Sequence, residues 1–79
     1  MTNEEKYLNA FTSTFNIDAE KVKTLKYRDI AAWDSVGHMT LVAAIEDAFD
    51  IMMDTDDVID LSSFEKGKQI LKEHYKIEW

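Results

Sequence analysis

Residues 34–38 bring together side chains that are capable of chemistry: Asp34, Ser35 and His38 lie within five positions of one another. An acid, a hydroxyl and an imidazole are the parts of a nucleophilic serine site. However, Trp33 occupies the first glycine position of the G-x-S-x-G pattern, and no predicted strand precedes the serine to form an elbow. A chain of 79 residues also has no room for a cleft between two lobes. We therefore disfavour a catalytic serine and expect that the chain is not an enzyme.

The same serine suits a different role. Asp34 or Ser35 is expected to cap a helix that runs to about Asp50, which puts the serine hydroxyl in the exposed first turn. A phosphate esterified there would face free backbone N–H groups. The position favours a phosphorylated or phosphodiester-modified serine over a catalytic one. The simplest alternative is that both residues only cap the helix.

A second candidate is the acidic segment that begins at Asp54. The acids Asp54, Asp56 and Glu65 have the spacing of positions one, three and twelve of an EF-hand calcium loop. The sixth position, which needs glycine for its sharp turn, is Ile59. The pattern therefore predicts no dedicated metal site, and the default interpretation is a solvated acidic face. Weak, non-specific divalent binding at a cluster of three acids is the remaining alternative: Asp54, Asp56 and Asp57.

The elements that would position these residues are predicted to be helices. The chain has no proline and only two glycines, which is too little turn punctuation for a β protein of this size. Apolar residues recur at helical spacing in segments 3–16, 35–50 and 63–75, and a short helix is expected at 56–60. We predict an all-α fold in a single domain, residues 1–79: a small four-helix bundle of three main helices and one short helix.

Local signals refine this expectation. Thr2 with Glu5, and Ser62 with Glu65, have the spacing of capping boxes for the first and last helices. The long first connection, residues 16–33, is expected to be functional or to be ordered by its own contacts.

Two further positions carry packing predictions. We expect His38 to be partly buried and hydrogen-bonded, because no second metal ligand stands at a suitable helical spacing. At least one of Met52 and Met53 should face the core, as methionines usually do.

The charges are unevenly distributed along the chain. Residues 29–65 contain ten acids and no lysine or arginine, whereas the remainder contains six acids and nine bases, so that −10 and +3 give the net charge of −7. This balance disfavours nucleic acid and anionic membrane surfaces and favours partners with basic patches. No cysteine is present to form a disulfide, a thiolate zinc site or a thiol nucleophile. With no secretory signal and no membrane span recognised, we expect a cytoplasmic protein.

The segments 29–36 (DIAAWDSV) and 41–51 (LVAAIEDAFDI) resemble the acyl carrier protein family, in which an Asp-Ser pair opens an amphipathic helix that ends in Glu-x-x-Phe. The resemblance covers essentially the whole chain. It implies that a separate phosphopantetheinyl transferase attaches 4′-phosphopantetheine from coenzyme A to Ser35. The thiol of that arm would carry acyl groups as thioesters. Asp34 would cap the helix and help to position the modifying enzyme's metal-bound coenzyme A.

The resemblance also implies partner-binding and cargo-binding residues. Acyl-loading and acyl-transfer enzymes with basic patches would recognise a surface on the central helix and after it, formed by Val36, Met39, Glu46, Asp47, Asp50 and Asp57. An interior pocket for the acyl chain would be lined by Val42, Ile45, Met53, Leu61 and Phe64. The carrier is expected to act as a monomer.

The sequence departs from the carriers of primary fatty acid synthesis at three positions. Gly37, Thr40 and Met52 stand where such carriers typically have acids. We therefore expect a specialised carrier that serves a secondary-metabolite, surface-polysaccharide or aminoacyl pathway. The alternative from another class is a small acidic calcium-binding or protein-interaction module without a prosthetic group.

Overall fold

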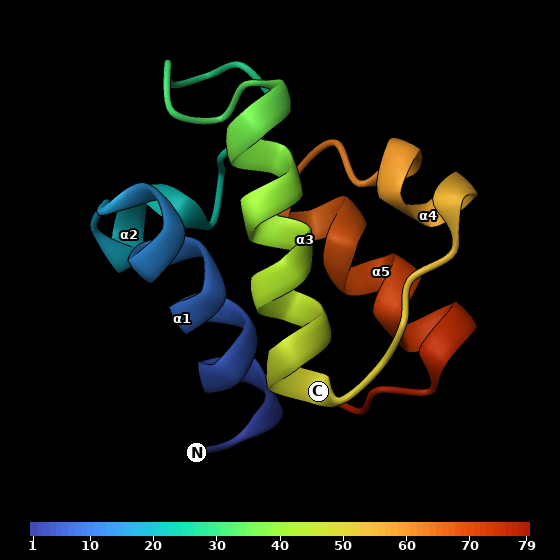
Figure 1. Cartoon of the computed structure of the whole chain (residues 1–79). Coiled ribbons are helices and arrows are strands. Elements are labelled where there is room, and N and C mark those ends of the chain that lie inside the picture. The colour runs from blue at the N-terminus through green and yellow to red at the C-terminus, as the bar shows by residue number, and fades with distance from the viewer.

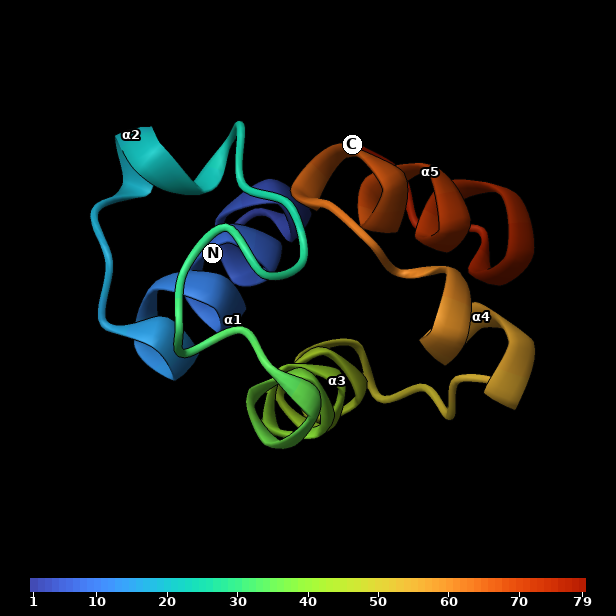
Figure 2. The ribbon, with the colours of Figure 1, turned by 90° about the horizontal axis from the view of Figure 1, so that it is seen from above.

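A computed structural model describes all 79 residues and contains five helices and no strand. Helices α1 and α3 lie side by side and run in opposite directions, and both termini lie at the end of the bundle away from the start of α3 (Figure 1). Seen from above, α1, α3 and α5 surround the core, and α4 lies beside α5 (Figure 2). The helices are α1 (Asn3–Phe15), α2 (Ala19–Val22), α3 (Ser35–Phe49), α4 (Thr55–Asp60) and α5 (Phe64–Tyr75).

These elements confirm the predicted all-α class and the three main helices. The short helix α4 is also present, and the single-turn α2 lies inside the expected long connection. No helix has both the length and the apolar character that crossing a bilayer requires.

Helices α1 and α3 each begin at a side-chain cap, as the sequence predicts. The Thr2 hydroxyl accepts from the Glu5 N–H at 3.1 Å, and the Glu5 carboxylate accepts from the Thr2 N–H at 2.9 Å, which completes the capping box. Of the two candidate caps of α3, the structure selects Asp34, whose carboxylate accepts from the Gly37 N–H at 2.9 Å. Each cap satisfies a backbone donor that has no partner inside the helix.

The predicted cap of α5 was wrong by one residue. Ser63 caps this helix, and its hydroxyl accepts from the Lys66 N–H at 3.0 Å. The Ser62 carbonyl instead accepts from the Tyr27 N–H at 2.8 Å, in a short antiparallel contact between the first connection and the start of α5. This long-range contact delays the helix by one position.

The core is rich in aromatic rings and includes Trp33, which is fully buried immediately before α3. The indole makes an edge contact with Phe11 at a centroid distance of 5.6 Å and lies 5.4 Å from Phe15, so it joins the first connection to α1. The buried apolar side chains are Tyr7, Ala10, Phe11, Phe15, Val22, Leu25, Trp33, Leu41, Val42, Ile45, Met53, Leu61, Phe64, Ile70 and Leu71.

The C-terminal tail folds back onto the bundle. The Trp79 indole N–H donates to the Lys68 carbonyl at 3.1 Å, and the ring lies 5.2 Å from Tyr7 and 5.9 Å from Phe49 by centroid distance. The tail therefore bridges α1, α3 and α5 at the end of the bundle that lies away from Ser35 (Figure 1).

Candidate functional site

The connection that leads to Ser35 is ordered by hydrogen bonds within itself, as its length predicts. The Arg28 N–H donates to the Trp33 carbonyl at 3.2 Å, and the Trp33 N–H donates to the Ile30 carbonyl at 3.1 Å. The Asp29 carboxylate accepts from the Lys26 N–H at 2.9 Å. These turns direct the Trp33 side chain inward and leave the start of α3 at the surface.

Gly37 allows this connection to pass close to α3. A Cβ atom at Gly37 would collide with the Ala32 carbonyl oxygen and would lie 3.3 Å from the Phe15 ring. A glycine inside a helix normally weakens it by about 1 kcal/mol relative to alanine. Here the absence of a side chain lets the backbone before Ser35 rest directly on the first turn of α3.

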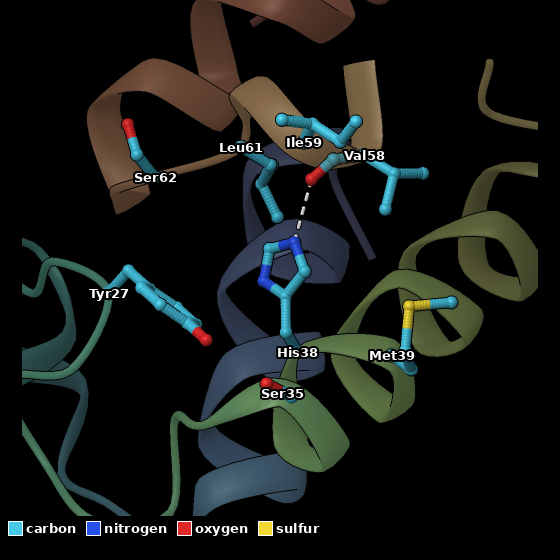
Figure 3. A pocket seen from close by; sticks show the side chains of 8 residues that line it. All are labelled: Tyr27, Ser35, His38, Met39, Val58, Ile59, Leu61 and Ser62. Carbon is cyan, nitrogen blue, oxygen red and sulfur yellow. Dashed lines mark hydrogen bonds between the residues drawn. The ribbon is translucent and has the colours of Figure 1, made fainter. Parts of the chain in front are cut away.

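Ser35 lies exposed at the first residue of α3 and at the edge of a cavity of about 410 Å³ (Figure 3). The volume falls within the range of ordinary small-molecule sites. The Tyr27 and Ser35 hydroxyls point toward one another, whereas the wall formed by α4 is apolar (Figure 3). The lining residues are Tyr27, Ser35, His38, Met39, Val58, Ile59, Leu61 and Ser62.

His38 uses both ring nitrogens in hydrogen bonds at this cavity. The Trp33 indole N–H donates to Nδ1 at 2.9 Å, and Nε2 lies 2.7 Å from the Val58 carbonyl oxygen (Figure 3). Since Nδ1 is an acceptor, the neutral tautomer with its proton on Nε2 satisfies both contacts. The predicted partly buried, hydrogen-bonded histidine is confirmed. The imidazole can act as a base toward Ser35 only by breaking one of these bonds.

Tyr27 lies beside Ser35, and Arg28 packs against Tyr27. Hydrogen bonding from the Ser35 side chain, followed by that from Arg28, lowers the pKa of the Tyr27 phenol, and the nearby Asp34 charge opposes this effect. The Arg28 guanidinium carbon lies 5.5 Å from the centroid of the Tyr27 ring. Sequence reasoning did not identify either residue, because the position of Tyr27 next to Ser35 depends on the turns of the first connection.

The two apolar residues predicted for partner recognition lie near Ser35. Val36 is 75% exposed and Met39 is 57% exposed, both in the first turns of α3. Ile59 of α4, which was not predicted, is 71% exposed and lines the same cavity. These side chains form an exposed apolar rim around the serine.

The acidic residues predicted for recognition have different environments. Asp47 and Asp50 are exposed. Glu46 is partly buried, and its carboxylate accepts from the Met53 N–H at 2.8 Å. It therefore also fixes the segment that follows α3.

Asp57 is buried, which corrects its assignment to the recognition surface. Its carboxylate accepts from the Tyr75 hydroxyl at 2.7 Å and pairs with His74 Nδ1 at 2.7 Å. The Tyr75 oxygen in turn accepts from the Asp54 N–H at 2.8 Å. Burial, followed by the bond with Asp57, raises the pKa of Tyr75. Asp57 thus joins α4 to α5 and does not present its charge to a partner.

The structure brings no three metal-ligating side chains together, at the acids from Asp54 to Asp57 or elsewhere. Helix α4 occupies the middle of the segment that would have to form an EF-hand loop, and Asp57 points inward. Residues 54–65 therefore do not form an EF-hand loop in this structure.

The residues predicted to line an acyl pocket are all buried, but only Leu61 lines the cavity beside Ser35. No cavity reaches the other four: Val42, Ile45, Met53 and Phe64. Met53 is buried and Met52 is 85% exposed, which confirms the prediction that at least one of this pair faces inward.

Together, the fold and the site define a small all-α protein with an exposed serine at the edge of a partly apolar cavity. Comparison of the chain with protein-family models, with curated proteins and with solved structures gave no match. The function of the site must therefore be inferred from its own residues and geometry.

Proposed function

We propose that this protein is a carrier of acyl or aminoacyl intermediates and that Ser35 is the attachment residue of a 4′-phosphopantetheine arm. The observation that carries the proposal is the position of Ser35: its side chain is exposed at the first residue of a 15-residue helix, next to a cavity of about 410 Å³. The sequence around it also resembles that of acyl carrier proteins.

The residues around Ser35 fit such an arm. The hydroxyls of Tyr27 and Ser62 offer partners for amide groups, and Met39, Val58 and Ile59 offer apolar contacts. An exposed serine also gives a modifying enzyme access that a buried residue would deny. His38 is engaged at both ring nitrogens, which makes a hydrolytic serine a poorer explanation of the same site.

Attachment would join the Ser35 Oγ to the phosphorus that carries the pantetheine group of coenzyme A. The P–O bond to the adenosine phosphate would break, adenosine 3′,5′-bisphosphate would leave, and the serine proton would pass to the transferase or to solvent. When bound, the arm supplies a terminal thiol that carries acyl groups as thioesters. Tethering would raise the effective concentration of the cargo at each partner's active site.

The chain's own surface is suited to presenting this cargo. Val36, Met39 and Ile59 form an apolar rim near Ser35. Asp47 and Asp50 place negative charge further along and at the end of α3, where it would attract basic partner surfaces. We assign the protein to a specialised pathway, because Gly37 and Thr40 stand at positions where carriers of primary fatty acid synthesis typically have acids.

Mass spectrometry tests the attachment directly. The purified protein is incubated with coenzyme A, Mg²⁺ and a broad-specificity phosphopantetheinyl transferase. We expect a gain of one phosphopantetheine mass, located by peptide fragmentation at Ser35. The matched variants are Ser35→Ala, which should gain no mass, and Ser13→Ala, which should gain as much as the parent. An unmodified parent, or a modified Ser35→Ala variant, would show that the proposal is wrong.

A further inference from the structure

One side chain of the first connection faces the atom to which the arm would be joined, and a second packs against it. The Tyr27 hydroxyl points toward the Ser35 hydroxyl across the edge of the cavity (Figure 3). The Arg28 guanidinium carbon lies 5.5 Å from the centroid of the Tyr27 ring. A phenol thus lies beside the serine, with a guanidinium packed against the phenol ring. Both groups can donate hydrogen bonds to anionic oxygens.

Arg28 is held here although its backbone conformation disfavours it. Its φ of 75° lies in the left-handed region, which glycine adopts far more easily than arginine. The turn is held by the bond from the Arg28 N–H to the Trp33 carbonyl. A glycine would fit the turn with less strain, so the folding of the turn alone does not explain an arginine at this position.

The Arg28 charge has no ion-pair partner within the molecule. The ion pairs of the structure join Lys68 to Glu4 and His74 to Asp57. Two acids close to Arg28 in the sequence accept backbone hydrogen bonds: Asp29 from the Lys26 N–H, and Asp34, the cap of α3, from the Gly37 N–H. The guanidinium contacts the Tyr27 side chain but has no anion paired with it inside the chain, so an anion added at Ser35 could become its partner.

We propose that Tyr27 and Arg28 form a clamp for a phosphate ester carried by Ser35. The inference rests on the proposed function, since it requires that Ser35 be esterified. The Tyr27 hydroxyl would donate to one phosphate oxygen and the Arg28 fork to another, which gives charge-assisted hydrogen bonds. Both are positioning residues: they hold the first bonds of the arm on the side of the serine that faces the first connection.

The clamp would also reduce the electrostatic repulsion that a phosphodiester on Ser35 would experience. Asp34 places negative charge next to Ser35, and an added phosphodiester would increase the repulsion. Arg28 is the last cation before the segment 29–65, which contains no lysine or arginine. The Arg28 charge would offset that of the ester, and the Tyr27 hydroxyl, which now points toward the serine hydroxyl, would point toward the ester oxygens.

The test compares modified proteins that differ only in the clamp. The parent, Arg28→Gln, Tyr27→Phe and the control Lys26→Gln are each converted with coenzyme A and the transferase, and mass spectrometry verifies complete conversion. The ³¹P resonance of the ester and the side-chain Nε–H resonance of Arg28 are then recorded by NMR. The same mass spectra distinguish a phosphopantetheine ester from simple phosphoserine, which would present the same phosphate chemistry.

We expect modification of the parent to shift the Arg28 Nε–H resonance and to slow its exchange with water. The ³¹P resonance should differ from that of the parent in Arg28→Gln and in Tyr27→Phe but not in Lys26→Gln. If fully modified parent and clamp variants have identical ³¹P resonances, and Arg28 Nε–H does not respond, the clamp does not exist. If no variant gains the phosphopantetheine mass, the proposed function itself has failed.

Discussion

At the scale of single residues, His38 connects three parts of the molecule. Its ring accepts from the buried Trp33 indole and donates to the Val58 carbonyl, so it joins the first connection, α3 and α4. Neither contact involves a neighbour on the same helical face, and both depend on one tautomer. The residue that most resembles a catalytic base in the sequence is therefore a structural link beside the serine.

Replacement of the His38 imidazole by an apolar side chain of similar size should lower the stability of the protein. We expect His38→Leu to lower the free energy of unfolding by about 2 kcal/mol or more, because the Trp33 N–H and the Val58 carbonyl each lose a partner. Urea unfolding followed by circular dichroism measures this loss. The neighbouring Met39→Leu serves as control and should change the stability by less than about 1.5 kcal/mol. Equal losses in the two variants would contradict the assigned role.

A second residue-scale prediction concerns alkaline pH. Tyr7 is fully buried and donates to the Phe64 carbonyl at 2.6 Å, and burial raises the pKa of its phenol well above the ordinary value. Above about pH 10 the unfolded chain releases this proton while the folded protein retains it, so the stability falls as pH rises. We expect Tyr7→Phe to be less stable than the parent at neutral pH, by about 1 kcal/mol.

The difference between Tyr7→Phe and the parent should become smaller above about pH 10, because the variant has no phenol to titrate at this position. Urea midpoints measured at neutral and at alkaline pH test the trend. A stability difference that stays constant across that range would show that Tyr7 does not cause the alkaline loss.

At the scale of elements, α4 depends on polar contacts for its position. It has six residues, which is too short for a helix to be stable by itself. The Asp57 carboxylate binds Tyr75 and His74 of α5, and the Val58 carbonyl binds His38 of α3. The wall of the cavity that α4 forms is thus held from both sides.

The link between α4 and α5 can be measured with a double-mutant cycle. We expect Asp57→Asn and Tyr75→Phe each to destabilise the protein, with a coupling of about 0.5–3 kcal/mol between them because they share one hydrogen bond. Chemical unfolding of the parent, both single variants and the double variant gives the coupling. Strictly additive losses would mean that the bond does not contribute to stability.

The close contact between the first connection and α3 predicts that alanine at Gly37, inside the helix, lowers the stability of the protein. An alanine inside a helix is normally more stable than glycine by about 1 kcal/mol. Gly37→Ala should instead destabilise the protein, because the new Cβ collides with the Ala32 carbonyl. The exposed α3 variant Thr40→Ala is the control and should change stability by about 0.5 kcal/mol at most. A stabilised Gly37→Ala variant would show that this contact is not present in solution.

At the scale of the whole molecule, the negative charge between residues 29 and 65 should control encounter with partners. We expect Asp47→Lys to slow the modification of Ser35 at low salt and to have less effect at high salt, since screening weakens electrostatic steering. Asp18→Lys changes the same charge outside this segment and should have a smaller effect. Initial rates across a salt series, followed by mass spectrometry, provide the measurement. Equal effects of the two variants would contradict steering by this segment.

The sequence predicts the three main helices well because each carries its own periodic apolar face and a local cap. It also singles out Ser35 as a candidate site, because this residue belongs to a short local motif, and its role stays a prediction. The cap at Ser63 could not be chosen over Ser62, because the choice depends on the Tyr27 N–H, which is distant in the chain. Trp33 stands outside any periodic segment, so its burial was not foreseen.

The composition of the site was harder to predict than its serine. The cavity combines residues of the first connection, α3 and the segment 58–62, which only the tertiary fold brings together. Asp57 appears as one of several equivalent acids in the sequence. Its burial depends on His74 and Tyr75, which follow it by 17 and 18 positions.

The position of the chain ends has a practical consequence. Both termini lie at the far end of the bundle from the first turn of α3 (Figure 1), and a 15-residue helix spans about 22 Å. An affinity tag, a bead or a fused enzyme can therefore be attached to either end without shielding Ser35. The molecule can be immobilised in a single orientation, with its serine directed toward the solution.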